Sequence, residues 1–176
     1  GIVTRPEGQI VVVDTPGVHK PVHRMNRLMM KSVREAMTEV DVLVLMVDAT
    51  QPFGKGDQFT LELIAPIQTK KVLVLNKVDK MRKQDLLPLI DRYSKLEDFD
   101  DIVPCSALTG ENVETLVKVL LRLLPIGPHY YPSEQFTDVQ ERSLASEIIR
   151  EKLIDRTLEE LPYSLAVSID PFGGRE

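Results

Sequence analysis

The sequence predicts an α/β fold with a mixed, mostly parallel sheet that helices flank on both faces. Short apolar runs at residues 10–13, 42–47 and 72–75 have too few residues for helices and are bounded by polar residues. Such runs are typical of strands that are buried on both faces of a parallel sheet. Helical patterns lie between them, and four alternations of strand and helix favour crossovers that place helices on either side of the sheet.

The first predicted element is an antiparallel hairpin formed by residues 1–5 and 9–14. Pro6, Glu7 and Gly8 make a tight connection, with the glycine at a point where a positive φ is needed. One edge pair of this kind is common beside parallel strands. Apolar residues at helical spacing then predict a series of helices. They cover residues 26–40, 61–65, 80–96 and 110–124, with buried strands at 41–48, 71–76 and ending in 104–108. Pro88 predicts a late start or a kink in the helix that contains it.

A second module follows a stiff linker. Prolines and a glycine are so dense between Pro125 and Pro132 that no helix can continue there, and we place the domain boundary in this stretch. Asp138 and Glu141 form a capping box for a helix that runs to about Glu160. Its apolar residues, which we expect to face inward, are Leu144, Ala145, Ile148, Ile149 and Leu153. Residues 163–170 alternate like a strand with one covered face. The predicted division is residues 1–124, a linker at 125–137 and a partial domain at 138–176.

Composition limits the class of protein. The chain has 176 residues, a formal net charge of −5 and one cysteine, Cys105. A single cysteine excludes a disulfide framework and fits a reducing cytosol, and the bulk charge indicates no nucleic-acid partner. We interpret Cys105 as a small buried residue rather than a catalytic thiol. No apolar run reaches membrane-spanning length and no signal peptide is visible, so a soluble cytoplasmic protein is predicted. Because the chain begins at Gly1 without a methionine, we expect a fragment of a longer protein.

Polar residues follow the strand at 72–75 directly and form the first candidate site, which consists of Asn76, Lys77, Val78 and Asp79. In an open α/β sheet, ligands bind beyond the carboxyl ends of the strands. Asp79 offers two acceptor oxygens that match the adjacent N1–H and N2–H₂ donors of guanine, a pair that adenine lacks. Asn76 either ties the loop to its neighbours or contacts the Hoogsteen edge, and the Lys77 stem can lie across the base. The motif therefore predicts a guanine site.

Two further motifs also follow predicted strands. The first comprises Asp14, Thr15, Pro16, Gly17 and Val18. Asp14 is placed to hold Mg²⁺ through a water, because Mg²⁺ keeps much of its hydration shell. Gly17 lacks a Cβ, so its N–H can approach a terminal phosphate, and the segment after it is the predicted switch. The second motif comprises Ser106, Ala107 and Leu108, whose backbone N–H groups can reach the guanine O6.

Together, these motifs resemble those of translation-factor-like GTPases. Residues 14–17, 76–79 and 106–108 look like the switch II, base-specificity and base-support motifs of that class. The linker and the following helix narrow the resemblance to the bacterial ribosome-assembly GTPase family Era. That narrower similarity lies in residues 127–132, 138–142, 147–152 and 160–164. The resemblance covers essentially the whole chain.

The resemblance implies a P-loop NTPase-type G domain followed by a partial α+β KH domain of type II. It further implies GTP hydrolysis coupled to binding of 16S rRNA near its 3′ end during assembly of the 30S subunit. GTP or GDP, Mg²⁺ and a monovalent cation such as K⁺ are the implied cofactors, and Asp14 is the metal ligand. Asp14, Gly17 and Val18 are the implied catalytic positions. Val18 matches an apolar position where Ras-like enzymes place a water-orienting glutamine, so we expect slow intrinsic hydrolysis. A monomer is the default expectation, and peripheral membrane association is implied by the family although no basic amphipathic helix is present.

The sequence also departs from the family pattern. It contains neither the Gly-x-x-x-x-Gly-Lys-[Ser/Thr] phosphate loop nor the Gly-x-x-Gly loop of a KH domain. We therefore assign the activity to a longer parent protein and expect the 176-residue chain alone to bind GTP weakly or not at all. Two alternatives stay open at this point: a non-hydrolysing RNA-binding scaffold, and a related GTPase of tRNA modification.

Overall fold

A computed structural model of the chain describes residues 1–13, 37–137, 141–156 and 167–168. The chain divides into two compact units. One comprises residues 3–130, and the other comprises residues 1–2 together with 131–176. The division between Tyr130 and Tyr131 falls inside the predicted linker. The pairing of the first two residues with the second unit was not predicted, and it includes a 2.9 Å hydrogen bond from the Ile2 amide to the Phe136 carbonyl.

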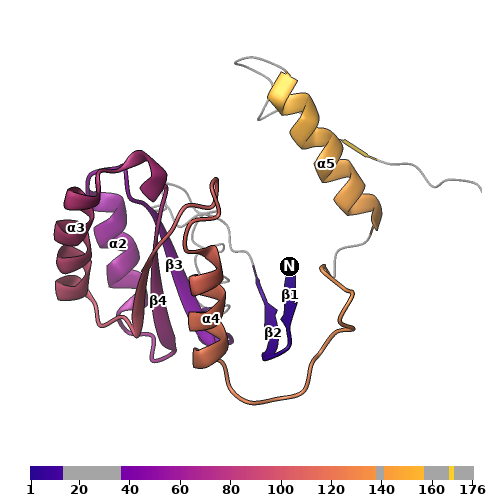
Figure 1. Cartoon of the computed structure of the whole chain (residues 1–176), viewed down its shortest axis with the longest axis horizontal. Helices are drawn as coiled ribbons and strands as arrows, with labels where there is room; N and C mark the ends of the chain where they lie inside the picture. Colours follow the sequence, from indigo (N-terminus) through magenta and orange to yellow (C-terminus); the bar gives the residue numbers. More distant parts are fainter. Residues whose placement is uncertain (14–36, 138–140, 157–166, 169–176) are drawn as a thin grey trace, which may run out of the picture. The chain divides into compact units, whose positions relative to one another are not determined.

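The larger unit is built on a three-stranded parallel sheet in the order β3-β4-β5 (Figure 1). The strands are β3 (Val42–Asp48), β4 (Lys70–Asn76) and β5 (Asp101–Pro104). Their register pairs Asp48 with Asn76 and Leu75 with Pro104. Because the strands are parallel, their carboxyl ends meet at one edge of the sheet, and this edge carries the predicted base-binding residues.

Alternate residues of β4 face two different helical layers, and the four residues 72–75 are fully buried. Leu73 and Leu75 pack in a cluster with α2 (Lys55–Ile64) and α3 (Lys83–Leu96). Val72 and Val74 pack with the apolar stripe of α4 (Val113–Leu123) on the opposite face. Figure 1 shows α2 and α3 on one side of the sheet and α4 on the other. The prediction of a strand buried on both faces is confirmed for β4.

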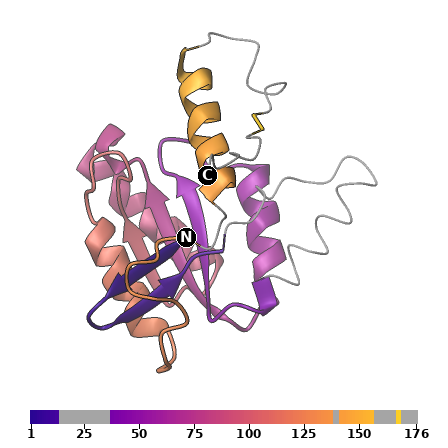
Figure 2. The ribbon, with the colours of Figure 1, turned by 90° about the vertical axis from the view of Figure 1, so that its right-hand side faces the viewer.

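The predicted hairpin consists of β1 (Ile2–Arg5) and β2 (Gly8–Val11), and β2 packs beside α4 (Figure 2). The expected role of Gly8 was wrong. Gly8 begins β2, and the positive φ among the described glycines falls at Gly110 instead, at 82°. A Cβ on Gly8 would lie 3.3 Å from Leu121 Cδ2, so Leu121 of α4 would have to shift slightly to accept a larger residue here.

The prediction that residues 10–13 and 42–47 form fully buried strands was also wrong. Ile10 is buried, but Val11, Val12 and Val13 are exposed, as are Val44 and Met46 of β3. In the described part of the chain, β1 and β2 form their own sheet, and no strand pairs with the second edge of β3. A groove of about 420 Å³ lies there instead. Its lining includes residues of β2, β3 and α4. The apolar residues of β2 and β3 that line it therefore stay accessible.

The helices agree with the predicted pattern except at their ends. The helix α2 begins at Lys55, earlier than its apolar residues indicated, because Asp57 Oδ2 accepts a 2.8 Å hydrogen bond from the Gly54 amide and closes the first turn. The helix α3 begins at Lys83 after a 3₁₀ turn, η1 (Val78–Lys80), and Pro88 lies inside it. The helix begins later than residue 80, but Pro88 lies beyond its first turn, so the proline does not set this start. None of the described helices is long and apolar enough to cross a membrane.

The second unit contains α5 (Glu141–Arg156), which lies within the predicted helix. The expectation that its apolar residues face inward was wrong for three of them. Ile148, Ile149 and Leu153 are 48%, 45% and 41% exposed, because the described residues of this unit leave them largely uncovered. Asp138 lies outside the described residues. So do most of the predicted strand at 163–170 and the predicted helix at 26–40 except its last turn.

Candidate functional site

The loop after β4 has a left-handed backbone at Lys77, whose φ is 67°. This conformation is uncommon for a residue with a side chain, and such residues cluster at functional sites. Asn76 enforces it here. Its Oδ1 accepts hydrogen bonds from the Lys77 amide at 2.8 Å and the Ala107 amide at 3.0 Å. The Val78 amide donates to the Cys105 carbonyl at 3.2 Å. Of the two arrangements considered for Asn76, the structure contains the one that ties the loop to its neighbour.

Asp79 lies at the surface, and a buried serine holds its carboxylate. The Ser106 hydroxyl donates a 2.6 Å hydrogen bond to Asp79 Oδ1, and Ser106 is fully buried. The same hydroxyl oxygen accepts a 3.2 Å hydrogen bond from the Thr109 amide, which fixes the direction of its own proton. A carboxylate has about four acceptor positions, so both Asp79 oxygens can still accept hydrogen bonds from a ligand.

The turn after β5 is closed by its own backbone. The Ser106 amide donates to the Glu111 carbonyl, and the Gly110 amide donates to the Ser106 carbonyl, both at 2.9 Å. Asn112 has a φ of 57° and donates from Nδ2 to the Pro104 carbonyl at 2.9 Å, which anchors the start of α4. Leu108 is 82% exposed on this turn. The turn therefore presents Leu108 to solvent.

Asp48, at the end of β3, belongs to the same edge although sequence reasoning did not select it. Its Oδ2 lies 2.6 Å from Lys77 Nζ, and its Oδ1 accepts from the Thr50 hydroxyl at 2.6 Å and the Thr50 amide at 3.0 Å. The hydrogen bond from Lys77, followed by those from Thr50, lowers the pKa of Asp48 to about 2. One feature of the sequence could have selected Asp48. It ends an apolar strand, as Asn76 does, and so lies at the same kind of position.

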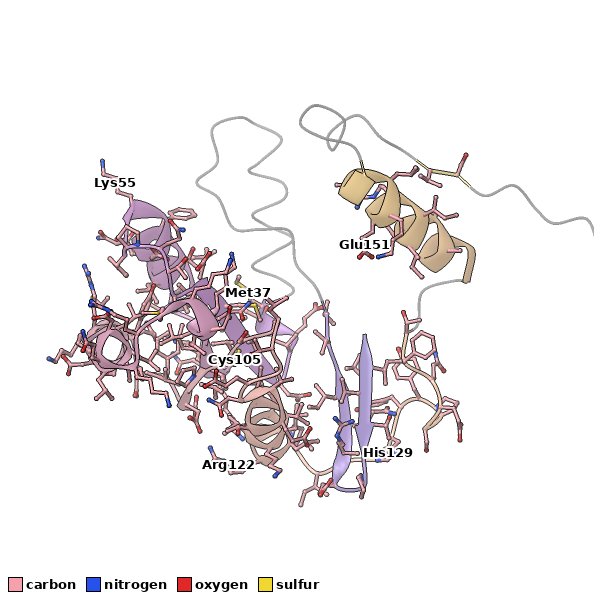
Figure 3. The ribbon with its side chains drawn as sticks, turned by 45° about the horizontal axis from the view of Figure 1, so that its top comes forward. Met37, Lys55, Cys105, Arg122, His129 and Glu151 are labelled. Carbon is pink, nitrogen blue, oxygen red and sulfur yellow. The ribbon has the colours of Figure 1, made fainter. Side chains whose placement is uncertain are left out.

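Cys105 follows β5 and is 2% exposed among packed side chains near α4 (Figure 3). Burial raises the pKa of its thiol. A buried thiol with a raised pKa is a poor nucleophile, so the interpretation of Cys105 as a small packing residue is consistent with the structure.

The structure brings two of the three predicted motifs together. Residues 76–79 and 106–108 meet through the bonds from Ala107 to Asn76 and from Ser106 to Asp79. The third motif, which consists of Asp14, Thr15, Pro16, Gly17 and Val18, lies outside the described residues. The described part of the site offers an exposed carboxylate between a lysine and a turn, at the carboxyl edge of a parallel sheet. This arrangement can accept two hydrogen bonds from a flat ligand with adjacent donors.

Comparison with known proteins identifies the fold. The sequence profile of the Elongation factor Tu GTP binding domain matches residues 3–126. A structure of Era in complex with MgGDPNP and nucleotides 1506–1542 of 16S ribosomal RNA has 36% sequence identity and a TM-score of 0.86. A point variant of Aquifex aeolicus Era bound to GDP and AlF₄⁻ has 37% identity and a TM-score of 0.83. These matches cover 97% and 95% of this chain.

The chain spans 59% and 57% of the lengths of those two Era chains. The apo form of translation elongation factor SelB from Methanococcus maripaludis is more distant, with 17% identity and a TM-score of 0.58 over 76% of this chain and 29% of its own, and it shows the fold alone. The profile match covers more than half of this chain, and the two Era structures match nearly all of it. The chain thus belongs to the family of the elongation factor Tu GTP-binding domain, and its G domain is of the Era type.

Proposed function

We propose that this chain supplies most of the G domain, and the beginning of an RNA-binding domain, of a protein that binds and hydrolyses GTP and assists assembly of the 30S ribosomal subunit. The observation that carries the proposal is the exposed Asp79 carboxylate, which the buried Ser106 orients at the carboxyl edge of the sheet. A guanine base presents two adjacent donors to such a group, whereas adenine does not.

In this proposal each residue of the edge has a separate role. Asp79 accepts from guanine N1–H and N2–H₂, and the Lys77 stem covers one face of the base. Asn76 holds the two loops together through the bonds to the Lys77 and Ala107 amides. The turn at Ala107 and Leu108 closes over the base and donates to O6, and Val78 completes the loop that carries Asp79.

The phosphate side of the site is assigned to residues 14–18. Asp14 holds Mg²⁺ through a water, and Gly17 contacts the terminal phosphate through its amide. Thr15 and Pro16 link these two positions, and Val18 occupies the place of a water-orienting residue without being able to orient a water. Hydrolysis is therefore slow without help from a monovalent cation such as K⁺ or from the ribosome.

The second unit is proposed to be the start of a type II KH domain that binds 16S rRNA, after a linker at 125–137. Its helix α5 would serve as scaffold, with the RNA contacts made mostly by later residues. The proposed protein is a monomer that binds the 30S subunit in the cytoplasm, and the single free cysteine, Cys105, fits a reducing compartment. Peripheral association with the inner membrane face belongs to the same proposal.

The test uses a protein that is extended upstream to include a phosphate-binding loop. Binding of GTP, GDP and ATP is measured by calorimetry for this protein and for its Asp79→Asn variant. We expect a preference for guanine nucleotides in the parent and a shift toward xanthine nucleotides in the variant, because the xanthine O2 accepts from an amide donor. Equal binding of GTP and ATP by the parent would refute the guanine site.

The RNA part of the proposal needs its own measurement. The same protein is titrated into an RNA with the sequence of the 3′ end of 16S rRNA and into a scrambled RNA of equal length. We expect tighter binding to the first RNA. Equal affinity for both would leave the GTPase assignment in place and remove the assignment of the RNA partner.

A further inference from the structure

We infer that Asp48 is a positioning residue of the base site, which holds the Lys77 ammonium away from Asp79. The inference rests on the proposed guanine site and adds a residue to it. Three strands contribute to the edge in this reading, with Asp48 from β3, Lys77 and Asp79 from the loop after β4, and Ser106 from the turn after β5.

The register of the sheet places Asp48 for this task. Asp48 pairs with Asn76 across β3 and β4, so its carboxylate ends one strand beside the loop that begins at Lys77. Lys77 Nζ lies 2.6 Å from Asp48 Oδ2. The lysine stem therefore runs along the edge toward β3, whereas Asp79 is held on the opposite side by Ser106 of the β5 turn.

The Asp48 carboxylate is oriented by Thr50, independently of Lys77. Its second oxygen, Oδ1, accepts from both the hydroxyl and the amide of Thr50, at 2.6 Å and 3.0 Å. These two bonds leave Oδ2 for Lys77 and set its direction. The low pKa of Asp48 keeps the carboxylate charged throughout the neutral pH range.

The Lys77 ammonium has a second carboxylate nearby, that of Asp79, so a restraint on its position is needed. Lys77 lies two residues before Asp79, and Asp79 is exposed with acceptor positions to spare. An unrestrained ammonium on a four-carbon stem would pair with that carboxylate, because opposite charges attract most strongly at contact distance. Such a pair would occupy the oxygens that read guanine. The Asp48 carboxylate removes this competition and keeps the stem extended over the place where the base lies.

The left-handed backbone of Lys77 supports the same reading. A φ of 67° is costly for a residue with a side chain, and the Asn76 side chain and the backbone bond from Val78 to Cys105 hold it in place. The backbone conformation sets the direction in which the Lys77 side chain leaves the loop, and Asp48 holds its ammonium group. With both ends held, the side chain needs little ordering when a base binds, which favours affinity.

The experiment measures GDP affinity in the upstream-extended protein for the Asp48→Asn variant. Asparagine keeps an oxygen for Thr50 but loses the charge that holds Lys77. We expect an affinity ~1.5- to 5-fold lower, the range of a partly exposed ion pair. A matched control is Asp91→Asn, which removes a 2.6 Å ion pair with Lys95 on α3 and should leave GDP affinity unchanged. Asp48→Ser is the second variant, for use if Asp48→Asn does not fold.

Two double variants distinguish positioning from a structural role. In a Lys77→Met background, Asp48→Asn should have no further effect on GDP affinity, since the ammonium is already absent. In an Asp79→Asn background, Asp48→Asn should change xanthosine diphosphate affinity less than it changes GDP affinity in the parent, since no carboxylate competes for the lysine. An undiminished effect of Asp48→Asn in either background would overturn the inference.

Failure of the inference is separable from failure of the proposed function. If the parent prefers GDP over ADP and Asp48→Asn binds GDP as tightly as the parent, the guanine site stands and the role of Asp48 falls. If the parent shows no preference for GDP over ADP, the guanine site falls and the role of Asp48 falls with it.

Discussion

The Ser106 hydroxyl and the Asp79 carboxylate are joined by a 2.6 Å hydrogen bond between residues 27 positions apart in the chain. Ser106 is fully buried and Asp79 is exposed, so the bond connects the interior of the β5 turn to the surface of the β4 loop. Hydrogen bonds to an ionised group are short and about twice as strong as neutral ones. This bond therefore fixes the direction in which Asp79 presents its acceptors.

Replacing Ser106 with alanine tests that connection. In Ser106→Ala the Asp79 carboxylate loses its donor, and a bond to a charged group is worth about 1.5–3 kcal/mol. In the upstream-extended protein we expect at least a tenfold loss of GDP affinity in calorimetry. The loss in the free energy of unfolding, measured with urea, should be smaller than the loss in the free energy of GDP binding. The matched control is Ser94→Ala, which removes a 3.0 Å bond from an exposed hydroxyl to the Asp91 carbonyl. Equal GDP affinity in Ser106→Ala and Ser94→Ala would show that the bond does not orient Asp79.

Lys71 and Glu97 form a nearly buried ion pair, and breaking it should destabilise the protein. Their side chains are 9% and 11% exposed, and Lys71 Nζ lies 2.6 Å from Glu97 Oε1. Lys71→Met leaves the carboxylate without its partner in a region where charge is poorly solvated. We expect a loss of about 3–5 kcal/mol in the free energy of unfolding, measured with urea. The double variant Lys71→Met/Glu97→Leu should recover most of that loss, because no buried charge remains.

The exposed pair of Lys95 and Asp91 is the control for this experiment. It has the same 2.6 Å distance, but its side chains are 71% and 62% exposed. Asp91→Asn should therefore cost about 0–1 kcal/mol. If breaking either pair lowers the free energy of unfolding by the same amount, burial does not explain the contribution of the Lys71 pair.

Tyr93 should make the stability fall at high pH. It is 1% exposed, and burial together with the nearby Asp57 carboxylate raises the pKa of its phenol well above the usual value. The unfolded chain loses the phenolic proton near pH ~10 while the folded chain keeps it. Stability from this group is therefore complete below pH ~10 and declines as pH rises above that value. In Tyr93→Phe this alkaline decline should be reduced, whereas Tyr130→Phe, at an 81% exposed position, should keep it. The measurement is urea unfolding between pH 8 and 11, a range set around the usual pKa.

Sequence reasoning succeeded where a residue's role depends on near neighbours in the chain. The burial of β4 followed from its apolar run, and the end of the strand followed from the polar residues that come after that run. It failed where the role depends on a distant segment. The exposure of Val44 and Met46 depends on which strand lies beside β3, and the restraint of Lys77 by Asp48 depends on the register between two strands. Neither relationship is visible in the local pattern.

Gly8 gives a last example of such a distant constraint, and it can be tested directly. A Cβ at Gly8 would lie 3.3 Å from Leu121 Cδ2 of α4, so the branched side chain of Gly8→Val must displace Leu121. We expect Gly8→Val to cost about 1–3 kcal/mol in urea unfolding, as overpacked positions do. Leu121→Ala should then be less costly in the Gly8→Val background than in the parent, with a coupling energy of about 0.5–3 kcal/mol.

Gly56 is the control, because nothing lies within 4 Å of a Cβ built there and it occupies α2. Gly56→Ala should stabilise the protein by about 0.4–1 kcal/mol, since alanine restricts the unfolded chain and fits a helix. If Gly8→Val and Leu121→Ala are additive, the packing of α4 does not restrict position 8. The coupling energy therefore decides whether the contact with Leu121 restricts this position.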